Sequence, residues 1–153
     1  MLKNQLKVIT VFCLILAIFT VRRNIPNGVY YDGDFMTMNI FSEYDCYFRI
    51  IHVDVNGESQ IIYPINETDD NFIKAGQTRF IPDNYRYRLT APFGEEYIHI
   101  AAYDEPFIID SPFTAPYIIA VEISDDLLSV ENENGKKINP FAVTGFKYII
   151  LPK

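Results

Sequence analysis

The chain has 153 residues, enough for one domain with its own core, and its 13 basic and 20 acidic side chains leave a net charge of −7. Aromatic residues make up 15% of it, with eleven Tyr, twelve Phe and no Trp, a composition that favours half-buried β-strands over helices. The acidic balance argues against nucleic-acid binding, because the release of counterions from phosphates requires clustered Lys and Arg. We therefore expect no nucleic-acid partner.

The N-terminus has the features of a targeting segment. Lys3 and Lys7 precede an uncharged apolar run over residues 8–21, a length typical of a signal peptide and short of the roughly 20 residues that span a hydrocarbon core. No small-residue cleavage motif precedes Arg22, so residues 1–21 are expected to form an apolar targeting helix that is either a cleaved signal peptide or an uncleaved signal anchor. Both alternatives predict an extracytoplasmic location, in the periplasm or cell envelope. The membrane is contacted only through this segment, and only if it is not cleaved.

After residue 24, apolar and polar residues alternate with a period of two, as they do in β-strands. Residues 35–41 and 46–53 predict the first two strands. In the second, Cys46, Phe48 and His52 share one face, and the opposite face is also largely apolar. We therefore expect this strand to be central in its sheet.

A hairpin is predicted after residue 53. Asp54, Asn56 and Gly57 lie in the turn DVNGES, where Asn and Gly tolerate positive φ. The strand QIIYP returns along its neighbour and ends at Pro64, because proline cannot donate a hydrogen bond to the ladder. In this interpretation the turn residues are structural, since they set the register of the hairpin.

Further strands bounded by turn-forming residues are predicted over residues 78–82, 85–90, 96–103, 117–124 and 143–151. Between the last two, ENENGKK is expected to be a solvated turn, and DDLLSV one helical turn at most. About eight short strands with almost no helix predict an all-β fold, in which residues 24–153 form a single β-sandwich domain.

Five motifs along the chain resemble, in order and spacing, the bacterial domain of unknown function 4384: YYDGD, DCYFRIIHVDVNGES, IIYP, NFIKAGQTRFIP and APFGEEYIHIAAYDEPF. The resemblance covers roughly Val29 to Phe107. One departure is the loop INETDDN after Pro64, where the family often has asparagine directly after the proline. The resemblance implies an immunoglobulin-like β-sandwich from an exported bacterial protein, and it supplies no catalytic residues, because none is established for that family.

The grouping of Cys46 with nearby polar residues raises the alternative of a small extracytoplasmic hydrolase that uses this cysteine or the loop carboxylates. A cysteine nucleophile needs a histidine base within hydrogen-bond reach. His52 lies six residues along the same strand, about 20 Å away, so only His99 on another strand could serve. The paired carboxylates, such as Glu95 and Glu96, are adjacent, and adjacent residues on an extended chain point to opposite faces. We therefore expect Cys46 to be a buried core residue and no residue to be catalytic.

No cofactor or metal is expected. A zinc site needs three or four convergent ligands, and the chain has two His with no H-x-H or C-x-x-C grouping. Glycine-rich loops that would cradle a phosphate are also absent from the sequence.

Two sets of residues are singled out. The structural set comprises Cys46, Tyr47, Asp54, Asn56, Gly57, Pro64, Gly76, Pro82 and Gly94. The candidate binding set comprises Tyr30, Tyr31, Arg79, Arg86 and Arg88. Strand alternation places the last two arginines on one face, where with Arg79 they would hold a carboxylate or an acidic partner strand; the alternative is a solvated sheet face. The two tyrosines are either first-strand packing or an exposed contact.

Taken together, these features favour an exported, non-catalytic β-sandwich module that mediates protein–protein interaction in the cell envelope. Its expected partner is another envelope protein, bound through a sheet edge or through loops.

Overall fold

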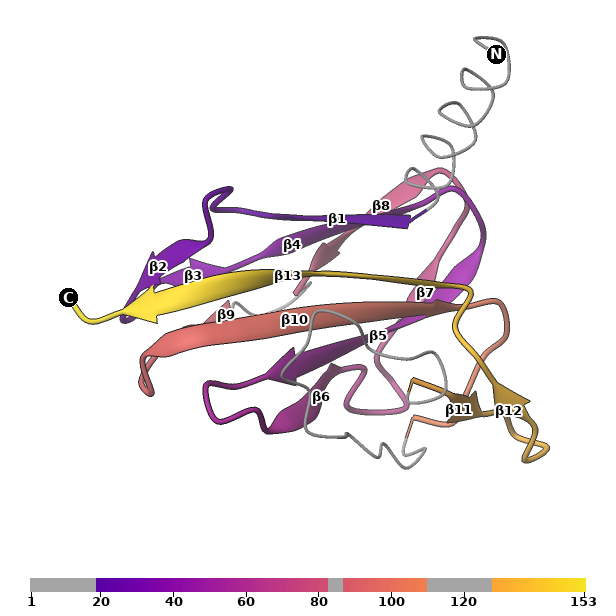
Figure 1. The fold of residues 1–153 in the computed structure, drawn as a ribbon. Helices are drawn as coiled ribbons and strands as arrows, with labels where there is room; N and C mark the ends of the chain where they lie inside the picture. The colour runs from indigo at the N-terminus through magenta and orange to yellow at the C-terminus, as the bar shows by residue number, and fades with distance from the viewer. Residues whose placement is uncertain (1–18, 83–86, 110–127) are drawn as a thin grey trace, which may run out of the picture.

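The computed structural model describes residues 19–82, 87–109 and 128–153, and within them the fold is all-β (Figure 1). The strands are β1 Phe19–Arg23, β2 Val29–Tyr31, β3 Phe35–Met36, β4 Met38–Ser42, β5 Cys46–Val53, β6 Ser59–Tyr63, β7 Phe72–Ile73, β8 Gln77–Ile81, β9 Tyr87–Arg88, β10 Gly94–Tyr103, β11 Val130–Glu131, β12 Lys137–Ile138 and β13 Ala142–Leu151.

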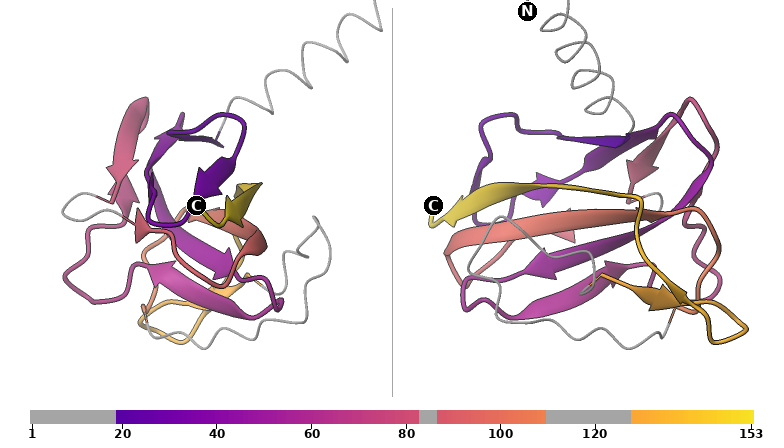
Figure 2. Two further views of the ribbon diagram at one scale, coloured as in Figure 1. Left: turned by 90° about the vertical axis from the view of Figure 1, so that its left-hand side faces the viewer. Right: turned by 45° about the vertical axis from the view of Figure 1, so that its right-hand side comes forward.

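Two sheets enclose the main core, as in a β-sandwich (Figures 1 and 2). The first sheet has the strand order β1-β4-β8, and the second has the order β2-β13-β10-β5-β6, with β7 also paired to β5. Met38 and Ile40 from the first sheet share one buried cluster with Phe48 and Ile100 from the second. We call the side of the second sheet that contacts this cluster its inner face. Burial of this cluster is the main stabilising term of the fold.

The outer face of the second sheet carries a smaller core. Ile51, Ala101 and Tyr103 alternate along β5 and β10 with the residues of the main cluster. The hairpin β11–β12 covers them with Val130 and Ile138 (Figure 1). A strand covered on both sides needs two apolar faces, which explains the composition of β5.

Most predicted strands in the described residues correspond to observed ones. The strand predicted over residues 46–53 is β5, with the same bounds, and the predicted hairpin pairs it with β6. Residues 35–41 form two strands, because Thr37 donates its backbone N–H to the Asn24 side chain between them. The segment ENENGKK is the turn of the β11–β12 hairpin. The strand predicted over residues 117–124 lies outside the described residues.

The domain begins earlier than predicted. Strand β1 starts at Phe19, inside the expected targeting segment, and it pairs antiparallel with β4. Phe19 is buried in the main cluster. The aromatic and β-branched residues at the end of the apolar run suit a strand as well as a targeting segment, and β1 lies before residue 24, where the domain was predicted to start. Residues 1–18, the rest of the predicted targeting helix, lie outside the described part; inside it, no helix is long and apolar enough to cross a membrane.

Candidate functional site

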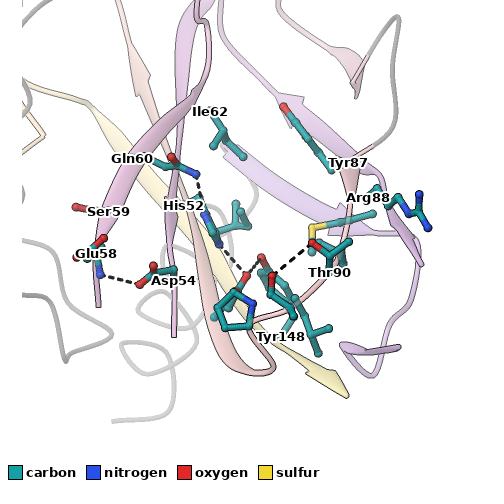
Figure 3. Close-up of a pocket in the computed structure, with 17 residues that line it drawn as sticks. His52, Asp54, Glu58, Ser59, Gln60, Ile62, Tyr87, Arg88, Thr90 and Tyr148 are labelled. Atoms are coloured by element: carbon teal, nitrogen blue, oxygen red, sulfur yellow. Dashed lines mark hydrogen bonds and ion pairs between the residues drawn. The ribbon is translucent and has the colours of Figure 1, made fainter. Parts of the chain in front are cut away.

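A cavity of about 500 Å³ lies between the inner face of the second sheet and the β3–β9 pair (Figure 3). Its walls mix apolar side chains such as Met36, Ile62 and Leu89 with polar ones. The volume falls within the usual range for small-ligand sites, about 300–1,000 Å³.

Four polar side chains of the cavity wall form a hydrogen-bonded chain, which we call the Glu96 cluster. The Tyr148 hydroxyl donates to Oε2 of Glu96 at 2.5 Å, and Nε2 of His52 lies 2.8 Å from the same oxygen. The amide nitrogen of Gln60 lies 3.4 Å from Nδ1 of His52, a longer and weaker contact (Figure 3). This series of hydrogen bonds therefore runs from the exposed edge strand β6 to the buried centre of the sheet.

Strand register brings these residues together. Glu96 on β10 stands directly opposite Tyr148 on β13, and on the other side of β10 its neighbour Ile98 stands opposite His52 on β5. Cross-strand neighbours on one face are close enough for their side chains to interact, including those on the diagonal. The three side chains consequently meet on the inner face, beside the main core.

The Glu96 cluster places a carboxylate in a low-dielectric setting. Glu96 is 5% exposed and Tyr148 is 4% exposed. Burial, followed by the hydrogen bond to Glu96, raises the pKa of Tyr148 well above its usual range, so the phenol stays protonated. The two contacts of His52 are both satisfied by one neutral tautomer, in which Nε2–H donates to Glu96 and Nδ1 accepts from Gln60.

The geometry does not bring the predicted hydrolase residues together. Cys46 is fully buried in the main cluster, and burial raises the pKa of its thiol. His99 alternates with Ile98 and Ile100 along β10, so it lies on the outer face, opposite to Cys46. Within residues 19–82, 87–109 and 128–153, no three His, Cys, Asp or Glu side chains gather closely enough to hold a metal ion.

The comparison with protein families decides the classification. The model of a domain of unknown function, DUF4384, matches residues 29–106, just over half of the chain. The chain belongs to the DUF4384 family. This confirms the resemblance drawn from the motifs between Val29 and Phe107. A search of the curated proteins found no match. The DUF4384 match includes His52 and Glu96, whereas Tyr148 follows it in the chain.

In this DUF4384 chain the two described arginines of the predicted face, Arg79 and Arg88, lie on strands of different sheets. Arg79 on β8 donates to the Asp70 carboxylate at 2.8 Å and to the backbone oxygens of Asp70 and Phe72, so it ties the preceding loop to its strand. Arg88 is exposed on β9, which pairs with β3 and not with β8. Arg86 lies outside the described residues. The long side chain of Arg79 thus has local partners that strand alternation does not reveal.

The two tyrosines of the candidate binding set differ in burial. Tyr30 is fully buried, donates to the Asn24 side chain at 3.0 Å and packs edge-to-face on Tyr148, with ring centroids 5.8 Å apart. Of the two alternatives for Tyr30, packing in the first strand is therefore correct and an exposed contact is wrong. The reason is that β2 pairs with β13, which places the Tyr30 ring in the core. Tyr31 is 46% exposed at the edge of the same sheet.

The residues predicted to be structural occupy turns, strand ends and core positions. Oδ1 of Asp54 accepts the backbone N–H groups of Asn56 and Glu58, and Gly57 takes a φ of 80° in the same turn. The Tyr47 ring packs on that of Phe72. The remaining members lie at strand ends: Pro64 follows β6, Gly76 precedes β8, Pro82 follows β8 and Gly94 opens β10.

Sequence reasoning missed the Glu96 cluster, although one signal was available. His52 alternates with Ile50 along its strand, and Glu96 alternates with Ile98. A polar residue in phase with core residues predicts an inward side chain that needs a partner. The partner was not predictable, because Tyr148 lies 52 residues from Glu96 along the chain.

Proposed function

We propose that this chain is an exported, non-catalytic module with an immunoglobulin-like fold that binds another protein of the bacterial cell envelope. The observation that carries the proposal is the cavity between the second sheet and the β3–β9 pair, which combines apolar walls with a buried carboxylate. Such a concave surface with few convergent polar groups suits recognition.

The strand order supports the immunoglobulin-like assignment. Immunoglobulin domains place strands A, B and E in one sheet and strands G, F and C in the other, and the variable type adds C′ beside C. Here β1-β4-β8 and β13-β10-β5 follow the same order along the chain, and β6 extends the second sheet beside β5.

The side-chain geometry supports a non-catalytic role. Cys46 and His99 lie on opposite faces of one sheet, and the turn carboxylate of Asp54 accepts backbone N–H groups of its own turn. His52 uses both ring nitrogens within the Glu96 cluster. A hydrolytic site would need a nucleophile at one of them.

The N-terminal sequence supports export. Positive charge precedes an apolar run, and β1 begins at Phe19. Cleavage after residue 21 would cut β1, so we expect the exported protein to keep every residue from Phe19 onward, whether or not the preceding segment is removed. Intact-mass measurement of the envelope fraction checks this. A soluble cytoplasmic pool of the full-length chain would contradict export.

Site-specific cross-linking in the living bacterium tests the binding role. A photoreactive residue at Gln60, which is exposed at the rim of the cavity, is compared with one at Asn134, which is exposed in the β11–β12 turn. We expect a defined envelope protein to be captured from position 60 and not from position 134. Identical capture at both positions, or none at position 60, would count against a partner that binds at the cavity.

A further inference from the structure

Only one of the two oxygens of the Glu96 carboxylate accepts hydrogen bonds from the described residues. Its two hydrogen bonds, from Tyr148 and His52, both end on Oε2. Oε1 has no hydrogen-bond or ion-pair partner among the residues that the structure describes. Glu96 is 5% exposed and lines the cavity, and Oε1 is not among the fully buried polar atoms that lack a hydrogen bond, so it keeps some surface that a ligand in the cavity can reach. A carboxylate with little access to water is stabilised by donors on both of its oxygens, so Oε1 is poised for a positively charged donor.

With His52 in the neutral tautomer that satisfies both of its contacts, the cluster supplies hydrogen bonds to Glu96 and no positive charge. His52 is then neutral, and Tyr148 is a neutral phenol. Arg88, the arginine at the cavity wall, points away from His52 (Figure 3). Asp54 and Glu58 at the wall add further negative charge. The potential inside the cavity therefore favours a cation.

The walls match a cation that has an apolar stem. Met36, Ile62 and Leu89 provide apolar surface along which methylene groups can lie. Tyr87 and Tyr148 contribute aromatic rings, which attract a cation further when it sits over their faces.

We propose that this cavity binds a primary alkylammonium group, with its charge on Oε1 of Glu96 and its methylene stem along the apolar wall. A guanidinium fits less well, because its planar fork is best matched by both oxygens of a carboxylate, and Oε2 already accepts two bonds. A compact ammonium needs only one oxygen. The source is a lysine side chain of a partner protein or a free aliphatic diamine, which present the same chemistry.

This inference rests on the proposed binding role and makes it specific. It predicts which group of the partner enters the cavity, and it is tested without knowledge of that partner. The two proposals also fail separately: loss of the ammonium site with retained cross-linking at position 60 overturns only the present inference.

Titration of the full-length chain in detergent micelles, followed by NMR of the His52 and Tyr148 rings, tests the site. The probes are Nα-acetyl-lysine methylamide, its uncharged analogue Nα-acetyl-norleucine methylamide, the corresponding arginine derivative, and 1,5-diaminopentane. We expect the lysine derivative to shift both rings, the arginine derivative to bind more weakly and the norleucine derivative not to bind. Tighter binding of the diamine than of the lysine derivative assigns the site to a free diamine; the reverse assigns it to a lysine side chain.

Paired variants locate the charge. Glu96→Gln keeps the side-chain shape and should weaken binding at least about tenfold. Glu95→Gln is the matched control, because this adjacent carboxylate is exposed and pairs with Lys147 on the outer face. Equal binding by the two variants, equal binding of the lysine and norleucine derivatives, or no shift of either ring below about 10 mM lysine derivative would overturn the proposal. The probe comparisons use the unaltered chain, so they decide the matter even where Glu96→Gln does not fold.

Discussion

Tyr148 donates its phenol hydrogen to Glu96 across the β10–β13 ladder, and both residues are buried. A second tyrosine–carboxylate pair, Tyr97 with Glu95, lies on the opposite side of the same strand and is solvent-exposed. The two pairs share their chemistry and differ in burial.

The contrast between these pairs gives the first prediction. Tyr148→Phe should lower the free energy of unfolding by about 1.5–3 kcal/mol, because it removes one of two donors from a buried carboxylate. Tyr97→Phe should leave the unfolding midpoint unchanged, because water replaces the lost donor. Urea unfolding of both variants checks this, and equal losses would show that burial of the Glu96 cluster does not strengthen its hydrogen bonds.

Cys46 provides the second prediction. Its thiol is fully buried, and burial raises its pKa, so the native protein should resist labelling by a bulky thiol reagent at neutral pH. Cys46→Ala should cost about 1–2 kcal/mol, since it leaves a small cavity, and should retain partner capture well below the melting temperature. Rapid labelling of the folded chain, or loss of partner capture at unchanged stability, would indicate that this cysteine is reactive and not structural.

The third prediction concerns alkaline pH. Burial raises the pKa of Tyr103 from 10.0 to about 12, so above pH 10 the unfolded chain loses this proton while the folded chain keeps it. The stabilising effect is complete below pH 10 and is lost as the pH rises to about 12, at about 1.4 kcal/mol per pH unit. Burial raises the pKa of Tyr148 in the same direction.

Tyr103→Phe isolates this contribution. The variant loses the hydrogen bond to the Leu128 oxygen and should be less stable than the unaltered chain at about pH 8. The difference should narrow by about pH 11, because the variant no longer has this group to titrate. Urea unfolding measures this difference in free energy of unfolding. A difference that stays constant over the same pH range would show that Tyr103 does not cause the loss of stability at alkaline pH.

Gly145 provides the fourth prediction. A Cβ at this position would lie 2.2 Å from the backbone oxygen of Ile98 on the neighbouring strand. Gly145→Ala should therefore force β13 away from β10 and cost about 3 kcal/mol or more. Gly135→Ala is the comparison, because its Cβ would meet nothing within 4 Å and only its φ of 73° is unfavourable, at about 1 kcal/mol. Equal costs, measured by thermal or urea unfolding, would contradict a close approach of the two strands.

The N-terminal boundary provides the fifth prediction. A chain that starts at Asn24 lacks β1 and the buried ring of Phe19, and should be less stable than one that starts at Phe19 by at least about 2 kcal/mol. Removal of the exposed residues Pro152 and Lys153 is the control and should have little effect. Equal stability of the chains that start at residues 19 and 24, compared by urea unfolding, would place β1 outside the cooperative unit.

Much of the fold was predictable because it depends on local alternation. The apolar pattern of residues 46–53 identified β5 and both of its faces, and the sequence DVNGES identified the turn that follows. The short strand β7 was not predictable, because its two residues carry no period of their own. Strand β1 was not predicted, because the same aromatic and β-branched residues suit a targeting segment and a strand.

For the candidate site, the sequence by itself determined which side chains point inward. His52 and Glu96 each alternate with core isoleucines, and the side-chain period of a strand is two. The tertiary structure decided which of them meet. Tyr148 reaches Glu96 only because β13 lies beside β10, and His52 reaches it only because β5 lies on the other side. Strand order is set by the burial of whole sheet faces, a long-range term that no local spacing encodes.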